Sequence, residues 1–194
     1  MSPEDRKERV EYLIKILSLT ACADTQVGRS FQRGISGGER KRTAIGYEMV
    51  TNPSLIFLDE PTTGLDSWTA YSVVRSLHKL AELGRTVVCT IHQPSSEIYA
   101  LFDRLILLSS GKTAFSGPAK KAVEYFSTIG YQCPPYSNPS DYYMKILKTR
   151  DATDQERVDK ITNQWLVHGK VGHPLTFMHP FHLFFIYFRP SFTT

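Results

Sequence analysis

Three short apolar runs constrain the fold of this chain more than any other feature. They are LIFL at 55–58, TVVCT at 86–90 and RLILL at 104–108, and helical patterns separate them. Apolar runs of this length are typical of strands that are buried on both faces of a parallel sheet. The sequence therefore predicts an α/β fold with a mainly parallel sheet and helical connections.

Helix caps and chain breakers set the boundaries around these runs. Ser2-Pro3-Glu4-Asp5 has the pattern of a helix start, and Gly84 suits the end of the helix that follows residue 67. Ser109-Ser110-Gly111 predicts a hairpin that returns the third strand into KTAFSG. The other helices are expected over residues 36–50, 67–83, 95–102, 118–129 and 139–148.

Composition excludes several classes of protein. A length of 194 residues suits one domain, and a net charge of +4, with scattered basic residues, is too mild to predict a nucleic-acid partner. Cys22, Cys89 and Cys133 are far apart and form no CxxC pair, so we expect free thiols. The charged N-terminus is not a signal peptide, and no run of about 20 apolar residues is present to span a bilayer.

Two acids follow the first apolar run, in LIFLDEP. The carboxyl ends of strands are where α/β sheets bind ligands, so Asp59 is a candidate Mg²⁺ ligand and Glu60 a candidate base for an attacking water. His92, in HQP after the second run, would lie in the same crevice as a donor to a phosphate. Taken singly, the acids fit a solvated loop better than a metal site, and the histidine fits a structural role better than a phosphate donor.

A glycine pair precedes the expected helix at 36–50. The sequence is ISGGERKR, in which Ser36, Gly37, Gly38 and Glu39 would present backbone N–H groups to an anion such as phosphate. A plain serine N-cap with a loop glycine pair explains the same residues if the motif stands alone. TTGLDS at 62–67 is, by itself, only a turn that leads into a helix.

The order and spacing of these motifs resemble those of ATP-binding cassette (ABC) nucleotide-binding domains. ISGGER, LIFLDEP, TTGLD and HQP follow one another on an expected helix, strand, loop and strand. The stretches RGISGGERKR, DEPTTGLDS and TIHQPSSEIYALFDRLILLSSGKTAFSGP are similar to the G subfamily, the White-type half-transporters. The resemblance covers roughly residues 5 to 148 and implies an α/β fold that is the C-terminal part of an ABC ATPase cassette.

The resemblance also implies a role for each motif. ATP and Mg²⁺ are the expected cofactors. The matching residues are Ser36, Gly37, Gly38 and Glu39 for the signature motif, Asp59 for the metal-binding end of Walker B, Glu60 for the catalytic glutamate, Asp66 for the D-loop and His92 for the switch histidine. The implied partners are a second ABC cassette, as homo- or heterodimer, a membrane domain absent from this chain, and a hydrophobic or lipid-like transport substrate. Through that membrane domain the family is held on the cytoplasmic face of a membrane, whereas the isolated chain is expected to be cytoplasmic.

One essential motif of the family is missing. No GxxxxGK[ST] sequence, the P-loop that grips the β- and γ-phosphates, occurs in the chain. The chain is expected to begin inside the family's helical subdomain and to lack strands that would pair with those at 55–58 and 86–90. We therefore expect weak Mg-ATP binding, no hydrolysis by the isolated chain, and unpaired strand edges that favour aggregation.

The motifs divide the chain into four expected segments. Residues 1–50 would be part of the helical subdomain with the signature motif, 51–117 the α/β core from Walker B to the switch histidine, and 118–150 a C-terminal helical extension of the G subfamily. Residues 151–194 are an unassigned tail, expected to be poorly ordered, although DATDQERVDKITNQWL has a helical pattern. The tail histidines His173, His179 and His182 lack a carboxylate or cysteine at ligand spacing, which favours an incidental cluster over a metal site.

Three functions stay open on these residues. The first is the ATP-hydrolysing portion of a G-type exporter. The second is a truncated, non-hydrolysing module that supplies only a signature motif to a partner. The third is a soluble ABC ATPase, which the HQPSSEIYALFD stretch and the mild charge disfavour.

Overall fold

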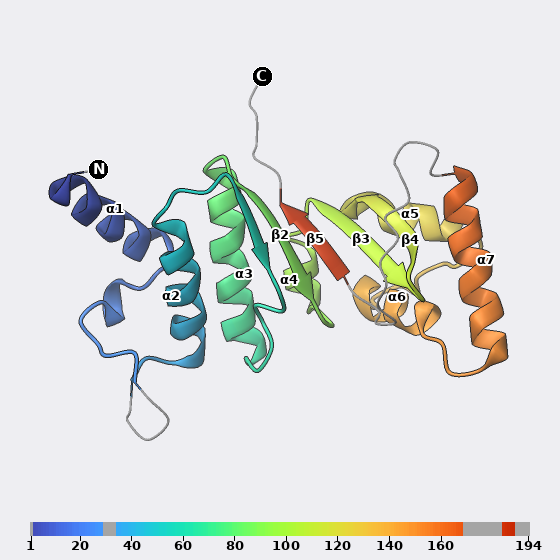
Figure 1. Cartoon of the computed structure of the whole chain (residues 1–194). Coiled ribbons are helices and arrows are strands. Elements are labelled where there is room, and N and C mark those ends of the chain that lie inside the picture. Colours follow the sequence, from blue (N-terminus) through green and yellow to red (C-terminus); the bar gives the residue numbers. More distant parts are fainter. Residues whose placement is uncertain (1, 29–33, 169–183, 189–194) are drawn as a thin grey trace. The chain divides into compact units, whose positions relative to one another are not determined.

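The computed structural model describes residues 2–28, 34–168 and 184–188, and helices and strands alternate between residues 37 and 109 (Figure 1). Tail residues His173, His179 and His182 lie outside the described residues. The elements, in chain order, are α1 (Pro3–Ile16), the short 3₁₀ helix η1 (Thr20–Cys22), α2 (Gly37–Met49), β1 (Leu55–Leu58), α3 (Ser67–Glu82), β2 (Thr86–Ile91), α4 (Ser96–Tyr99), β3 (Arg104–Ser109), β4 (Lys112–Pro118), α5 (Ala119–Thr128), α6 (Pro139–Leu147), α7 (Ala152–His168) and β5 (Phe184–Phe188).

The described residues fall into two compact units. The first contains residues 2–28, 34–57 and 61–87, and the second contains residues 58–60, 88–168 and 184–188. The α/β fold expected from the three apolar runs is confirmed, since each run forms a strand with helices between them.

Helices α1, α2 and α3 build the first unit. Helix α3 contributes a continuous buried face to its core, because Val73, Val74, Leu77 and Leu80 recur at helical spacing and are all at most 1% exposed. Gly84 follows the helix with φ of +89°, and its N–H and that of Arg85 bond to carbonyls of the last turn. The expected glycine C-cap is therefore present.

Strand β1 differs from the expected strand with two buried faces. Ile56 is buried, but Leu55 is 47% and Phe57 is 72% exposed. Successive side chains of a strand point to opposite faces. Only one face of β1 is thus covered by the described residues, which a wholly apolar sequence does not reveal.

The strand order in the sheet is β1-β2-β5-β3-β4. Strands β3 and β4 form the predicted hairpin, with Ser110 and Gly111 at positive φ in the turn. β5 pairs antiparallel with β3, with Arg104 opposite Tyr187, and it lies between β3 and β2. The edge of β2 that was expected to lack a partner is therefore paired with a strand from the tail.

The second unit has an aromatic core under the hairpin. Phe126 of α5 stacks on Tyr143 of α6 with ring centroids 4.7 Å apart, and Phe115 of β4 lies 5.2 Å from Trp165 of α7. Val158 of α7 is fully buried. Helix α7, which covers the first part of segment 151–194, is thus packed into the core of this unit.

Candidate functional site

The signature residues form the start of α2. Ser36 is the N-cap, and its Oγ accepts a hydrogen bond of 3.3 Å from the Glu39 backbone N–H. The Glu39 carboxylate accepts one of 2.8 Å from the Ser36 N–H, which completes a capping box. The bond from the Ser36 backbone N–H, and after it the Ser36 side chain, hold the pKa of the Glu39 carboxylate below its usual value. A helix N-terminus of this kind carries a partial positive charge.

The two glycines of the motif have different surroundings. Gly37 is exposed, and a Cβ there would lie 3.3 Å from a Leu65 methyl group. Gly38 is buried, and a Cβ there would overlap the Thr69 methyl group on α3. Gly38 therefore permits close packing of α2 on α3. Gly37 and the N-cap Ser36 are exposed, so an anion in solution can reach them.

Asp66 of the D-loop position caps α3. Its carboxylate accepts bonds from the Thr69 N–H at 3.0 Å and from the Thr69 hydroxyl at 2.6 Å. These two bonds, the hydroxyl one first, lower the pKa of Asp66. Because the Thr69 methyl group contacts Gly38, the cap of α3 and the start of α2 are joined through one side chain.

The two acids after β1 are linked to β2 by one hydroxyl group. The Thr90 Oγ1 donates to Asp59 Oδ1 at 2.7 Å and accepts from the Glu60 backbone N–H at 2.8 Å. Thr90 is buried, whereas the Asp59 side chain is exposed. Glu60 has a φ of +42°, the left-handed region that non-glycine residues seldom adopt. The strand end thus turns sharply at the acids, as is common at functional sites.

His92 directly follows β2, two residues after Thr90, and is exposed. Gln93 has a φ of +49°, so this strand also ends in a left-handed turn. The Pro94 carbonyl accepts bonds from Asn138 Nδ2 at 2.9 Å and from Ser140 Oγ at 2.8 Å. The start of α6 therefore anchors the loop that carries His92.

The structure groups the candidate residues in two sets. Asp59, Glu60 and His92 belong to the second unit, at the ends of strands that are neighbours in the sheet. The first unit contains Asp66 and the signature residues Ser36 to Glu39.

Sequence patterns alone missed Thr90, Asn138 and Ser140. Asn138 is the N-cap of α6, and that local signal was available, but its bond to Pro94 joins residues 44 positions apart. Arg42 of ISGGERKR is buried, and its guanidinium donates to Ser72 of α3 at 3.3 Å.

The residues fit a metal that is shared with a nucleotide. Among the described residues, no cluster of three or more His, Cys, Asp or Glu side chains is placed to hold a metal ion. Mg²⁺ is commonly bound by one or two carboxylates together with substrate phosphates and water. Asp59 suits the role of the protein carboxylate because it is exposed and its carboxylate is oriented by Thr90.

Two family models match the chain. The model described as "ABC transporter" matches residues 3–63, and the model described as "ABC-2 type transporter" matches residues 92–182. The second match extends beyond residue 148, where the resemblance was expected to end.

Curated relatives support the same family. The chain is 53% identical over 147 residues to the broad substrate specificity ATP-binding cassette transporter ABCG2 of Rattus norvegicus, which covers 76% of this chain and 22% of the relative. It is 47% identical over 156 residues to ATP-binding cassette sub-family G member 8 of Homo sapiens, covering 80% and 23%. It is 45% identical over 166 residues to protein white of Drosophila melanogaster, covering 84% and 24%. The chain thus spans less than a quarter of the length of these relatives.

A solved structure supports the fold. The ADP conformation of MJ1267, an ATP-binding cassette of an ABC transporter, aligns with a TM-score of 0.51 at 22% identity over 64% of this chain and 48% of that one. Within the described ranges, no helix is both long and apolar enough to cross a membrane. The family models, relatives and fold agree: the chain belongs to the G subfamily of ABC transporters and covers part of its nucleotide-binding cassette.

Proposed function

We propose that this chain is the part of a G-type exporter that closes on ATP held by a second cassette. The observation that carries the proposal is the α2 N-terminus, where the N-cap Ser36 and the first helical residue Gly37 are exposed and a capping box is formed. Such an end binds a γ-phosphate through the positive end of the helix dipole and through backbone N–H groups. No P-loop occurs in the sequence, so the main grip on that phosphate belongs to the partner.

Asp59, Glu60 and His92 have the side-chain chemistry that phosphoryl transfer needs. In this proposal Asp59 holds Mg²⁺, Glu60 orients the attacking water and His92 donates to the γ-phosphate. Thr90 fixes the Asp59 carboxylate and the Glu60 peptide, and the Asn138 and Ser140 bonds to Pro94 fix the His92 loop. Mg²⁺ would supply charge stabilisation at the phosphate.

The activity of the whole transporter follows as part of the proposal. ATP binding and hydrolysis by two cassettes would drive the export of a hydrophobic or lipid-like substrate through a membrane domain, with the cassettes on the cytoplasmic face. By itself the chain would bind Mg-ATP weakly and release no phosphate. Turnover by the purified chain that disappears in Glu60→Gln would contradict this part.

ATP-dependent association tests the proposal. The fluorescently labelled chain is titrated with an intact cassette of a G-subfamily relative whose catalytic glutamate is replaced by glutamine, with and without Mg-ATP. We expect association only with Mg-ATP, and a loss of about tenfold or more in affinity for Ser36→Ala, because a bond to a charged phosphate is removed. Ser2→Ala, which removes the same kind of cap from α1, is the matched control and should leave the affinity unchanged. Equal association without ATP, or equal loss in both variants, would contradict the proposal.

A further inference from the structure

Two arginines of the first unit share one uncharged acceptor. Arg9 Nη2 donates to Asn52 Oδ1 at 3.0 Å, and Arg85 Nη2 donates to the same oxygen. All three residues belong to one compact unit, although they are far apart in the sequence. Because both donors reach a single oxygen atom, two positive charges are held close together around a neutral amide.

Each guanidinium group is also fixed at the end of a helix. Arg9 Nη2 donates to the carbonyl of Met49, the last residue of α2, at 2.7 Å. Arg85 Nη1 donates to the carbonyl of Leu83, the C-cap of α3, at 2.7 Å. The Tyr12 ring lies under the Arg9 guanidinium, with its centroid 5.7 Å away. A helix C-terminus carries only about half a negative charge, so these contacts orient the arginines and offset their charges in part.

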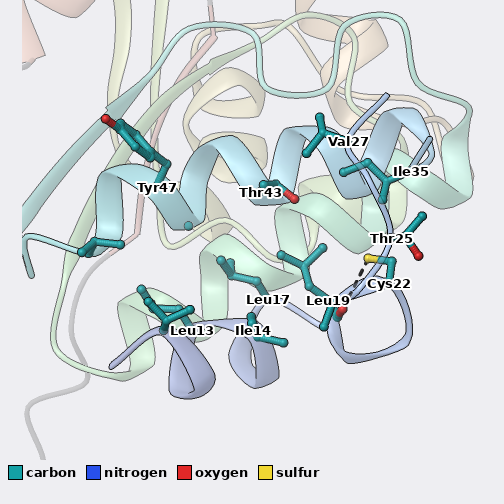
Figure 2. Close-up of a pocket in the computed structure, with 14 residues that line it drawn as sticks. Leu13, Ile14, Leu17, Leu19, Cys22, Thr25, Val27, Ile35, Thr43 and Tyr47 are labelled. Atoms are coloured by element: carbon teal, nitrogen blue, oxygen red, sulfur yellow. Dashed lines mark hydrogen bonds between the residues drawn. The ribbon is translucent and has the colours of Figure 1, made fainter. Parts of the chain in front are cut away.

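Packing of α1 on α2 holds Arg9 in place. Arg9 lies four residues before Leu13, on the same side of α1. Leu13 and Leu17 are buried and lie in the apolar space between α1 and α2 (Figure 2). A Cβ at Gly46 of α2 would lie 3.0 Å from a Leu17 methyl group, so the two helices are close there. The position of the arginine pair is therefore set by the fold before any ligand binds.

The described part of the chain supplies no carboxylate to this pair. Within residues 2–28, 34–168 and 184–188, neither Arg9 nor Arg85 forms an ion pair with an Asp or Glu side chain. Among the same residues, the buried Arg9 Nε has no hydrogen-bond partner. Burial, and after it the charge of Arg85, lower the pKa of the Arg9 guanidinium. The repulsion between the two charges is thus not offset by an anion.

Another arginine of the chain shows the usual arrangement. Arg157 also binds carbonyls at the end of a helix, those of Ile146 and Lys148, at 2.8 and 2.9 Å. Its guanidinium is paired with the Asp154 carboxylate at 2.6 Å. An arginine that only fastens a helix end thus has its own carboxylate here, which the pair in the first unit lacks.

The charges and donors of the pair set the chemistry of a ligand. A guanidinium has five N–H donors in a planar fork that fits the oxygens of a phosphate or carboxylate. The bonds above use two N–H groups of each arginine. Two positive charges match a doubly charged anion, and a phosphomonoester carries about −1.5 to −2 at pH 7, whereas a carboxylate carries a single charge. Both arginines are half-buried and Asn52 is exposed, so a phosphate in solution can reach them.

We propose that Arg9 and Arg85 form a binding site for a doubly charged phosphate group, with the Asn52 amide between them. A soluble phosphate compound and the headgroup of a phospholipid share this chemistry. The site lies at the opposite end of α2 from Ser36, and a helix of 13 residues is about 20 Å long. It is therefore separate from the proposed contact with ATP and does not depend on it. The tests contain neither nucleotide nor a second cassette.

Titration with inorganic phosphate tests the site. The ¹⁵N-labelled full chain is titrated at about pH 7, with sodium chloride adjusted to keep the ionic strength constant. We expect saturable shifts of the amide resonances of residues 50–52 and 83–86. Arg85→Gln removes charge-assisted hydrogen bonds and should weaken binding by about tenfold or more. Arg75→Gln removes the same charge from the exposed face of α3, so it is the matched control and should keep the affinity.

Asn52→Asp tests the site without removing an arginine. The new carboxylate replaces the oxygen that accepts from both guanidinium groups, so it should supply the missing anion and abolish phosphate binding. Phosphate should raise the melting temperature of the wild-type chain. Asn52→Asp should melt at a higher temperature without phosphate and gain nothing from it. Asn163→Asp, at an exposed position of α7, adds the same charge elsewhere and should behave like the wild type.

Vesicles identify the source of the phosphate group. The chain is sedimented with phosphatidylcholine vesicles that contain or lack phosphatidic acid. Sedimentation that requires phosphatidic acid and is lost in Asn52→Asp would assign the site to a lipid headgroup. Phosphate binding without such sedimentation would assign it to a soluble phosphate compound. The proposal would be overturned by an absence of saturable phosphate binding, by equal affinity of the wild type and Asn52→Asp, or by equal weakening in Arg75→Gln and Arg85→Gln.

Discussion

Helices α1 and α2 begin with the same pair of hydrogen bonds, but the residues between the bonded positions differ. In α1 the Ser2 N–H donates to Asp5 at 2.7 Å and the Ser2 hydroxyl accepts from the Asp5 N–H at 3.0 Å. The corresponding distances between Ser36 and Glu39 in α2 are 2.8 and 3.3 Å. Both are capping boxes, so the cap alone does not mark a phosphate site.

The residues between cap and closing acid make the difference. In α1 these are Pro3, which has no N–H, and Glu4, which brings a negative charge. In α2 they are Gly37 and Gly38, whose N–H groups lie among the first four of the helix and have no intrahelical partner. An anion is therefore repelled at one start and attracted at the other.

The largest expected contrast is at the second helical residue. Gly38→Ala should lower the free energy of unfolding by about 1–3 kcal/mol, because the new methyl group overlaps Thr69 in packed surroundings. Glu4→Ala, at the same position of α1, is exposed and should change it by less than about 0.5 kcal/mol. Urea unfolding followed by circular dichroism measures both. Equal effects would mean that Gly38 is not needed for packing.

Removal of either cap should cost the same stability but should affect ATP-dependent association at only one of them. Ser36→Ala and Ser2→Ala each delete one cap acceptor, so each should cost about 1 kcal/mol in the same unfolding experiment. The expected result is that the two losses match in stability while only Ser36→Ala weakens ATP-dependent association. A much larger stability loss for Ser36→Ala would indicate that the serine is mainly structural.

The smallest effect is on acid stability. The pKa of Glu39 is lowered in the folded chain, so its contribution is present above its unfolded pKa of about 4.3 and is lost as the pH falls through the folded value. Glu39→Gln should therefore cost about 0.3–1 kcal/mol at pH 7 and almost nothing near pH 3. Free energies of unfolding of both proteins, measured between pH 3 and pH 7, test this pH dependence. A cost that does not change with pH would assign the loss to packing.

Local sequence signals made the helix caps, the hairpin turn and the positions of the motifs predictable. The cap at Ser36, the glycine after α3 and the hairpin turn each depend on residues within a few positions of one another, and each is found where expected. The positions of the two acids and His92 at strand ends were also predictable, because each follows an apolar run directly in the sequence.

Long-range contacts were not predictable from patterns. Thr90 meets Asp59 across 31 positions, and Ser140 meets Pro94 across 46. The exposure of Phe57 depends on which face of the sheet is covered, and the role of Gly38 depends on Thr69 of another helix. None of these is encoded in the spacing of neighbouring residues.

Photocleavage by vanadate tests most directly whether the start of α2 lies against the γ-phosphate of an ATP that a second cassette holds. Orthovanadate with Mg-ADP replaces the γ-phosphate, and ultraviolet light cleaves the peptide backbone beside it. The chain is mixed with an intact G-subfamily cassette, irradiated, and its fragments are sequenced. We expect cleavage of this chain within residues 36–39, only when the partner cassette is present, and none at the α1 start. Cleavage without the partner, or no cleavage at the α2 start when the partner is bound, would contradict it.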